Sequence, residues 1–247
     1  MIPEEELRYL AYAEEKIAQE LNKYGDDQAD LKQDLYEKRK YLWQELVGAE
    51  RAIQDRYERT AQESDIAAAE KTLTEAQLQA HRLKKLRDIP YFARVDFRED
   101  GYSSESFYIG KFGLTDMENF DQVICDWRSD VAALYYNFEP GAASFDCPNG
   151  TVRGELTRKR QFQIERGEML GCFDTERSIQ DQFLQRILGA HAGEQMKTIV
   201  DSIQKSQDEI IRDTAHSVVI IEGCAGSGKT SVALHRIAYL LYHARSS

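Results

Sequence analysis

Long apolar runs and paired cysteines are scarce in this chain of 247 residues, and its 32 basic residues are outnumbered by 43 acidic ones. No apolar run approaches the roughly 18 residues of a membrane-spanning helix, and the acidic start MIPEEELRYL lacks the apolar region of a signal peptide. The four cysteines form no CxxC pair, which disfavours a zinc site and favours a reduced, cytoplasmic protein. The net charge of -11 argues against nucleic acid as the main partner of this sequence taken whole.

Catalytic side-chain groupings are equally sparse. The five histidines are scattered and suggest neither a metal site nor a catalytic triad. No paired carboxylates stand where general acid–base chemistry would need them. Any chemistry must therefore come from another kind of motif.

Residues 1–88 contain one proline and two glycines, and their apolar residues recur with heptad spacing. This pattern predicts an antiparallel helical hairpin, a coiled coil, with its tip near residues 45–65 and with its first helix continuing through Gly25. The predicted rows are Leu7, Leu21, Leu35 and Leu42; Leu10, Ile17, Tyr24 and Leu31; and Ile66, Ala69, Leu73, Ala76, Ala80 and Leu83.

The predicted tip is rich in acidic residues, which could be an ordinary solvated hairpin end or a surface that approaches a metal-bearing site in a partner. The acids are Glu45, Glu50, Asp55, Glu58, Glu63 and Asp65.

Residues 89–173 change character, because Pro90 ends the helical pattern and alternating stretches follow. They predict a compact antiparallel β module, with turns at PNG and ERG and with its aromatic residues, Trp127 among them, in the core. The expected strands lie in YFARVDF, FYIGKFGL, DQVICDW, ALYYNF and the stretch ASFDCPNGTVRGELTRKRQFQIERGEML.

Residues 174–247 are expected to be the start of a RecA-like ATP-binding domain. Helical periodicity over residues 177–212 is followed by SVVIIEG, which reads as a buried strand, by GCAGSGKT and by an amphipathic helix. The predicted fold class is therefore α+β to α/β, with domains at 1–88, 89–173 and 174–247.

The glycine-rich run matches the phosphate-loop pattern G-x-x-x-x-G-K-[ST]. Its glycines and backbone amides suit phosphate oxygens, Lys229 would neutralise β- and γ-phosphate charge, and Thr230 would place its hydroxyl on Mg²⁺. Cys224 is expected to be a small filler rather than a redox group. The predicted nucleotide-binding residues of this segment are Gly223, Cys224, Ala225, Gly226, Ser227, Gly228, Lys229, Thr230 and Ser231, with Lys229 and Thr230 as the catalytic pair.

The stretch GCAGSGKTSVALHRIAYLL resembles superfamily 1 helicases of the UvrD/Rep kind. Gln207, in IQKSQDEIIR, stands at the spacing of that group's Q motif, in which a glutamine amide reads the edge of adenine. The resemblance implies ATP and Mg²⁺ as cofactors, with Gln207 as a further nucleotide-binding residue.

The runs PYFARVDF, YIGKFGL, CDWRSD, LYYNFEPG, GELTRKRQFQIERG and MKTIVDSIQKSQDEIIR occur in the order seen in the HelD family of RNA polymerase recycling motors. This resemblance implies a helicase-like ATPase that binds RNA polymerase, with the N-terminal arm in the secondary channel. It also implies that a second half, beyond these residues, makes most of the contact with DNA or RNA. The chain is thus expected to be an N-terminal fragment that binds ATP weakly and does not turn it over.

One departure from that family pattern is visible, since Asp130 stands where the run D-W-R-A-P has its proline. Two other functions stay open: a 3′–5′ DNA repair helicase of the UvrD/Rep type, and a non-catalytic coiled-coil interaction module. The basic runs at 81–87 and 157–166 could contact nucleic acid or polymerase, or could be solvated faces paired to nearby acids.

Overall fold

The structure is a computed structural model that describes residues 2–48, 54–148, 150–174, 203–224 and 226–244. The chain divides into two compact units. One unit joins residues 1–10 to residues 89–247, and the other comprises residues 11–88. The architecture is α+β, with a helical N-terminal region followed by a mixed sheet.

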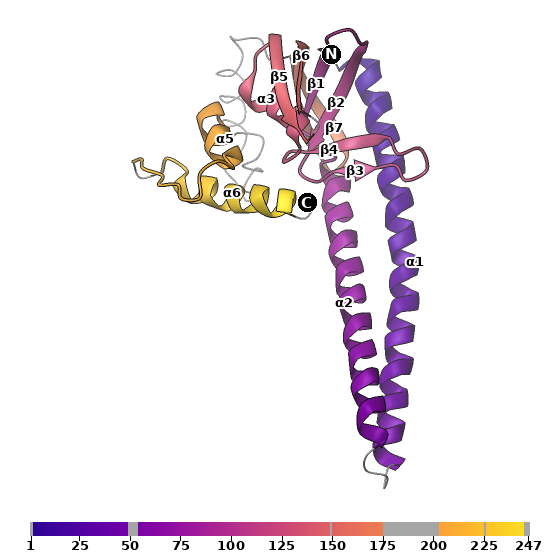
Figure 1. Cartoon of the computed structure of the whole chain (residues 1–247). Coiled ribbons are helices and arrows are strands. Elements are labelled where there is room, and N and C mark those ends of the chain that lie inside the picture. Colours follow the sequence, from indigo (N-terminus) through magenta and orange to yellow (C-terminus); the bar gives the residue numbers. More distant parts are fainter. Residues whose placement is uncertain (1, 49–53, 149, 175–202, 225, 245–247) are drawn as a thin grey trace. The chain divides into compact units, whose positions relative to one another are not determined.

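The helical unit is an antiparallel hairpin of α1 (Glu4–Gly48) and α2 (Gln54–Asp88), whose coils run side by side in Figure 1. α1 continues through Gly25, as the heptad pattern predicts. The ion pair between Arg39 and Glu70 (2.6 Å) joins the two helices. α1 extends to Gly48 and α2 begins at Gln54, so the described parts of the expected tip at 45–65 are helical.

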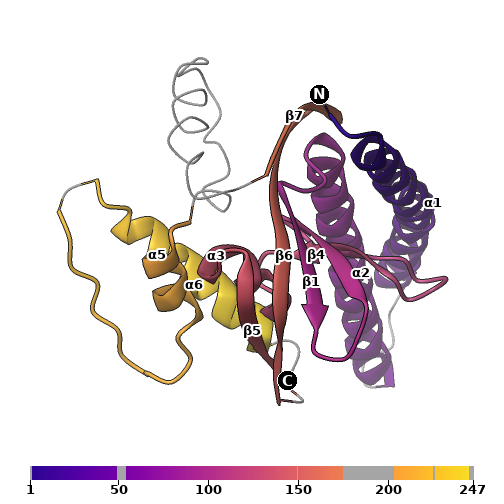
Figure 2. The same cartoon turned by 90° about the horizontal axis from the view of Figure 1, so that it is seen from above.

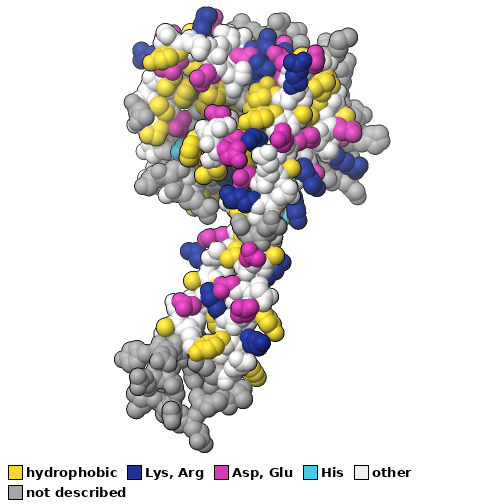
Figure 3. Space-filling model, turned by 90° about the vertical axis from the view of Figure 1, so that its right-hand side faces the viewer, with side chains coloured by type: hydrophobic (Ala, Val, Ile, Leu, Met, Phe, Trp, Pro, Cys, Tyr) yellow, Lys and Arg dark blue, Asp and Glu magenta, His cyan; other side chains and the backbone are white. Residues whose placement is uncertain are grey.

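Small and aliphatic side chains line the inner side of this hairpin. The predicted row on α2 is confirmed, because its alanines and Leu83 are buried. On α1 the row that contains Ile17 is the better buried, whereas Leu7 of the other row is 46% exposed. The outer surface carries Lys, Arg, Asp and Glu side chains of both signs intermixed (Figure 3). This is the amphipathic pattern of a helix pair that uses one stripe for packing.

The other unit is built around a seven-stranded sheet with the order β3-β4-β2-β1-β6-β5, and β7 pairs with β6. The predicted β-hairpins at YFARVDF/FYIGKFGL and around ERG are confirmed. Arg166 and Gly167 both have positive φ (54° and 80°), which is the geometry of a tight two-residue hairpin turn. The strands are β1 (Ala93–Glu99), β2 (Ser104–Gly110), β3 (Leu114–Thr115), β4 (Gln122–Asp126), β5 (Gly141–Cys147), β6 (Gly150–Glu165) and β7 (Glu168–Asp174).

The prediction of a purely antiparallel module is wrong, because β2 and β4 pair in parallel. The short β3 lies between them in sequence and forms the edge of the sheet, and β4 then pairs with both β3 and β2. A Cβ at Gly110, the end of β2, would lie 2.4 Å from the Pro90 carbonyl oxygen and 2.7 Å from Ile124 Cγ2. Only glycine allows this close approach of the two strands.

The prediction of a strand at ALYYNF is also wrong. The 3-10 helix η1 (Asp130–Ala132) leads into the short helix α3 (Ala133–Asn137). Leu134, Tyr135 and Tyr136 are all buried, so the run shows no alternation, and a short apolar run cannot distinguish strand from helix by periodicity.

Helices α5 (Lys205–Arg212) and α6 (Lys229–Ala244) share the hydrophobic core of the sheet unit. Figure 2 shows α3, α5 and α6 grouped on one side of β6. Ile211 of α5 and Val232 and Tyr239 of α6 are buried in the same cluster as Phe92 and Trp127. Residues 177–202 of the predicted helical stretch lie outside the described residues.

A buried ionic cluster joins the first turns of α1 to the strands of the sheet unit. Glu6, fully buried, accepts hydrogen bonds from Arg94 Nη1 (2.7 Å), Arg160 Nη1 (2.6 Å) and Tyr108 Oη (3.0 Å). Nearby, Tyr9 stacks on Tyr108 with ring centroids 3.5 Å apart. The second predicted basic run is therefore at least partly paired, because Arg160 also donates to Asp174 (2.6 Å).

Candidate nucleotide-binding site

The glycine-rich loop leads directly into α6, which begins at Lys229. Gly226 and Gly228 both have φ of +82°, a left-handed conformation that other residues rarely adopt. The first helical hydrogen bond runs from Val232 N to the Gly228 carbonyl oxygen (2.9 Å). Left-handed residues followed by a helix N-terminus are typical of backbone concavities that bind anions.

The ammonium group of Lys229 folds back onto the loop that precedes it. Its Nζ donates to the carbonyl oxygens of Gly223 (2.8 Å) and Cys224 (2.6 Å). The Ser227 amide also donates to the Cys224 carbonyl oxygen (3.3 Å). The loop is therefore closed on itself, with its one lysine at the phosphate-loop position and its positive charge held against the backbone.

Gln207 lies beside this loop. A Cβ placed on Gly228 would be 3.2 Å from Gln207 Nε2, so the two residues are in contact despite their separation in sequence. The other end of the amide is engaged, since Gln207 Oε1 accepts a hydrogen bond from Gln204 N (3.2 Å) at the start of α5. The donor end of the carboxamide thus faces the loop, and the acceptor end caps its own helix.

Thr230, the predicted Mg²⁺ ligand, is exposed on the first turn of α6, next to the half-buried Ser231. Among the described residues there is no cluster of three histidine, cysteine or acidic side chains that could hold a metal. A single hydroxyl still fits Mg²⁺, because that ion keeps several waters and takes its other ligands from substrate phosphates. The described part of the site therefore fits a metal that arrives with the nucleotide. Ala225 lies outside the described residues.

The prediction that SVVIIEG forms a buried strand is wrong. Residues 217–222 have no regular secondary structure, and Val218 and Ile220 are 77% and 82% exposed. A buried parallel strand needs hydrogen-bonding neighbours and helices on both faces, and no described strand pairs with this segment.

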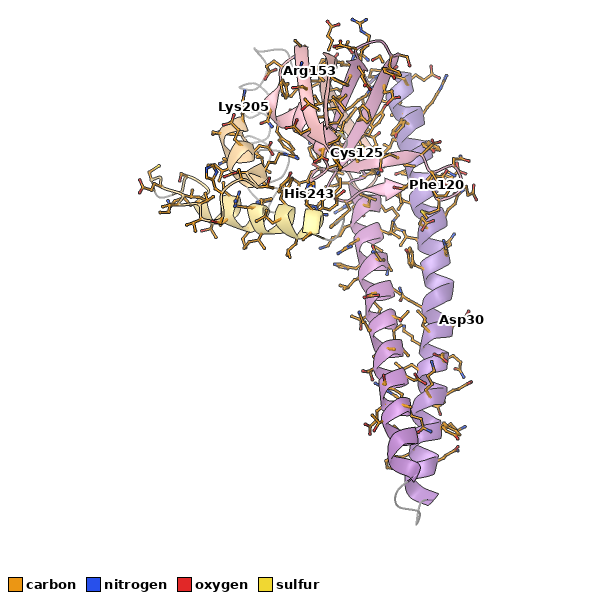
Figure 4. All side chains as sticks on the ribbon, viewed as in Figure 1. Asp30, Phe120, Cys125, Arg153, Lys205 and His243 are labelled. Carbon is orange, nitrogen blue, oxygen red and sulfur yellow. The ribbon has the colours of Figure 1, made fainter. Side chains whose placement is uncertain are left out.

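The run Asp126–Asp130 forms a turn that contacts both helices of the candidate site. Asp126 holds Arg128 by two side-chain hydrogen bonds (2.7 and 2.6 Å). The guanidinium of Arg128 lies over the ring of Tyr242, 4.7 Å from its centroid. Figure 4 labels His243 at the end of α6, and its Nε2 lies 3.1 Å from the Arg128 carbonyl oxygen.

One face of α6 rests on this turn. The ring of His235 meets Trp127 edge to face at 5.3 Å, and Tyr239 lies under the guanidinium of Arg212 at 5.3 Å. His235, Tyr239, Tyr242 and His243 share the face generated by helical spacing. Residues 235–243 of the helix that begins at the phosphate loop thus pack against the turn after β4 and against Arg212 of α5.

Arg212 of α5 makes the second connection to the turn. Its Nη2 donates to the Trp127 carbonyl oxygen (2.7 Å) and its Nη1 to that of Ser129 (3.0 Å). Its Nε donates to both oxygens of Asp208 (2.9 Å each), and Asp208 Oδ2 also accepts from Asn137 Nδ2 (2.9 Å). Asp208 is fully buried, and burial raises the pKa of its carboxyl above the ordinary value of 3.8 despite Arg212.

With this geometry in view, the comparisons with known proteins are decisive for the family. The family model described as "DNA helicase IV HelD, N-terminal domain" matches residues 4–186. The chain belongs to this HelD family. No curated protein matches the sequence. The matched residues include the helical hairpin and the whole sheet, and they end before Gln207 and the glycine-rich loop.

Three residues beside the candidate site were not predicted from the sequence. They are Asn137, Asp208 and Arg212. The run QDEIIR carries a weak signal, because Asp208 and Arg212 are one helical turn apart. That spacing alone suggests an exposed pair, and only the packing reveals that Asp208 is buried and that Arg212 is mostly covered by the turn.

The acidic tip is only partly described. Glu63 and Asp65 are exposed on α2, and the placement of the side chains of Glu45, Glu50, Asp55 and Glu58 lies outside the described residues. All four cysteines are free, and burial raises the pKa of the Cys125 thiol to about 12. None of the described helices is long and apolar enough to cross a lipid bilayer.

Proposed function

We propose that residues 223–231 bind the triphosphate of ATP, with Gln207 beside the base and Thr230 on Mg²⁺. The observation that carries the proposal is the contact between Gln207 and Gly228, which brings the expected base reader to the phosphate loop. Lys229 would exchange its loop carbonyls for phosphate oxygens, and the left-handed glycines would let the backbone amides approach them. Bound Mg²⁺ would supply charge neutralisation between phosphate oxygens.

A nucleotide titration by calorimetry tests the site. We expect Lys229→Ala to weaken Mg–ATP binding at least tenfold, because one ammonium group is lost from a triphosphate site. Thr230→Ala should reduce the dependence of binding on Mg²⁺. Lys84→Ala, an exposed lysine of α2, is the matched control and should bind as the parent chain does. Equal affinities for the parent chain and Lys229→Ala would contradict the proposal.

For the whole protein, we propose a helicase-like ATPase that binds RNA polymerase through the helical hairpin and helps release it from nucleic acid. Family membership and the presence of an extended two-helix unit support this. The division into an arm (1–88), a β module (89–173) and the start of an ATP-binding domain (174–247) is part of the proposal. Replacing the acidic tip residues by amides should weaken the effect on polymerase and leave ATP binding intact.

The second candidate is a DNA helicase proper, which the family's description as DNA helicase IV favours. Co-purification with RNA polymerase that depends on the hairpin would support the first candidate. DNA unwinding without any association with polymerase would support the second.

A further inference from the structure

The short helix α5 carries Gln207 and is held by several part-buried polar contacts. It has only 8 residues, and a helix of that length is marginal by itself in water. Its orientation must therefore be set by tertiary contacts. Asp208, next to Gln207, is fully buried, and Ile211 is 1% exposed.

These polar contacts reach the β module at three points. Arg212 donates to the carbonyl oxygens of Trp127 (2.7 Å) and Ser129 (3.0 Å), and Asn137 donates to Asp208 (2.9 Å). From the other side, Arg236 Nη1 of α6 donates to the Ile210 carbonyl oxygen (2.6 Å). The helix is thus fixed between the turn after β4 and the helix that follows the phosphate loop.

A buried ion pair of this kind is weak evidence for stability, because desolvation of both charges offsets their attraction. Its geometric consequence is larger. A side-chain tip lies at a radius of roughly 6 Å from a helix axis, so a rotation of about 30° would move it by about 3 Å. That displacement exceeds the tolerance of a hydrogen bond. Contacts that prevent the rotation therefore decide where the Gln207 amide points.

We infer that Arg212, Asp208 and Asn137, anchored on the turn at residues 126–130, are positioning residues that aim Gln207 at the nucleotide base beside Gly228. They touch neither base nor phosphate and act through Gln207. This inference rests on the proposed function of the loop. It also gives the run D-W-R-S-D a role: its backbone carbonyls at Trp127 and Ser129 receive the guanidinium that orients the base reader.

The test is a double-mutant cycle with two ligands, Mg–ATP and Mg–inorganic triphosphate, on the 247-residue chain. Gln207→Ala should weaken ATP binding about tenfold and leave triphosphate binding within about twofold, because one base contact is lost. Arg212→Lys keeps the charge and loses the guanidinium fork, so it should weaken ATP binding about three- to tenfold with triphosphate again unchanged. The double variant should be no weaker than Gln207→Ala alone.

Several outcomes would overturn the inference. Additive losses in the double variant, or an equal loss of ATP and triphosphate in Arg212→Lys, would mean that Arg212 only supports the fold. Unchanged ATP binding in Gln207→Ala would also overturn the inference. In that case, triphosphate binding that still depends on Lys229 would continue to support the proposed phosphate-binding role of the loop. The control is Arg160→Lys, which replaces a buried guanidinium of the same unit far from α5 in sequence. It should change the affinity for neither ATP nor triphosphate.

Discussion

In the helical hairpin the inner residues are alanines and aliphatic side chains, and the ion pair Arg39–Glu70 that joins the helices is exposed. In the sheet unit, Glu6 and Asp208 are fully buried and each is held by arginine. An exposed pair contributes little because water screens it, whereas a buried charge that loses its partner is costly. The hairpin thus depends on repeated small apolar contacts, whereas the sheet unit combines a hydrophobic core with buried charges that are costly to leave without a partner.

Removing Glu6 should give the largest effect. Glu6→Ala leaves Arg94 and Arg160 without their shared buried carboxylate, so we expect a loss of about 3–5 kcal/mol in the free energy of unfolding. Urea denaturation followed by tyrosine and tryptophan fluorescence would measure it. Glu5→Ala is the matched control, because the neighbouring side chain is 55% exposed, and it should cost under about 1 kcal/mol. Similar losses for both variants would mean that the sheet unit does not depend on the buried carboxylate of Glu6 more than on an exposed one.

A core truncation in the hairpin should come next. Ile17 is fully buried, and Ile17→Ala should reduce the stability of the helical unit by about 2–4 kcal/mol through lost burial and a cavity. Leu78→Ala, at a position that is 54% exposed on α2, should change stability by less than about 1 kcal/mol. Thermal denaturation monitored at 222 nm would compare them. A negligible loss at Ile17 would mean that the hairpin does not depend on its apolar stripe.

Glycine-to-alanine substitutions should change stability in opposite directions in the two units. Gly25→Ala lies mid-helix with nothing within 4 Å of the added carbon, so it should stabilise the hairpin by about 0.5–1 kcal/mol. Gly101→Ala has equal space but φ of +89°, so it should destabilise the β1–β2 turn by about 1 kcal/mol. Chemical denaturation of both variants would test this, and a shared sign would contradict the assignment of backbone strain.

The smallest effect should be a pH dependence at Asp174. The hydrogen bond from Arg160 lowers the pKa of this carboxyl below its ordinary value of 3.8. A lowered folded-state pKa contributes stability that is present above the unfolded-state value and is lost as pH falls through the folded-state value. Because Asp174 is half exposed, we expect only a fraction of a kcal/mol between about pH 5 and pH 3.

Urea midpoints measured across that pH range would isolate the Asp174 contribution. Asp174→Asn should show a shallower loss of stability with acid than the parent chain. An identical slope in both proteins would show that the pair with Arg160 is not formed in solution.

Much of the fold could be predicted where structure follows local pattern. Heptad spacing identified both helices of the hairpin and the continuity through Gly25, and turn residues at ERG identified β6–β7. The failures have a shared cause. ALYYNF became α3 and SVVIIEG became irregular, because short apolar runs take their structure from their neighbours. The parallel β2–β4 pair likewise depends on where β3 turns the chain.

The sequence by itself determined the composition of the candidate site: a loop with glycine where left-handed backbone is needed, one lysine, one threonine and a glutamine upstream. These are local requirements of backbone conformation and ligand chemistry. Only the tertiary structure decided that Gln207 meets Gly228, that Asp208 is buried, and that Arg212 packs against the turn after β4. Burial and orientation depend on contacts between residues far apart in the chain, and no local pattern encodes which of those contacts form.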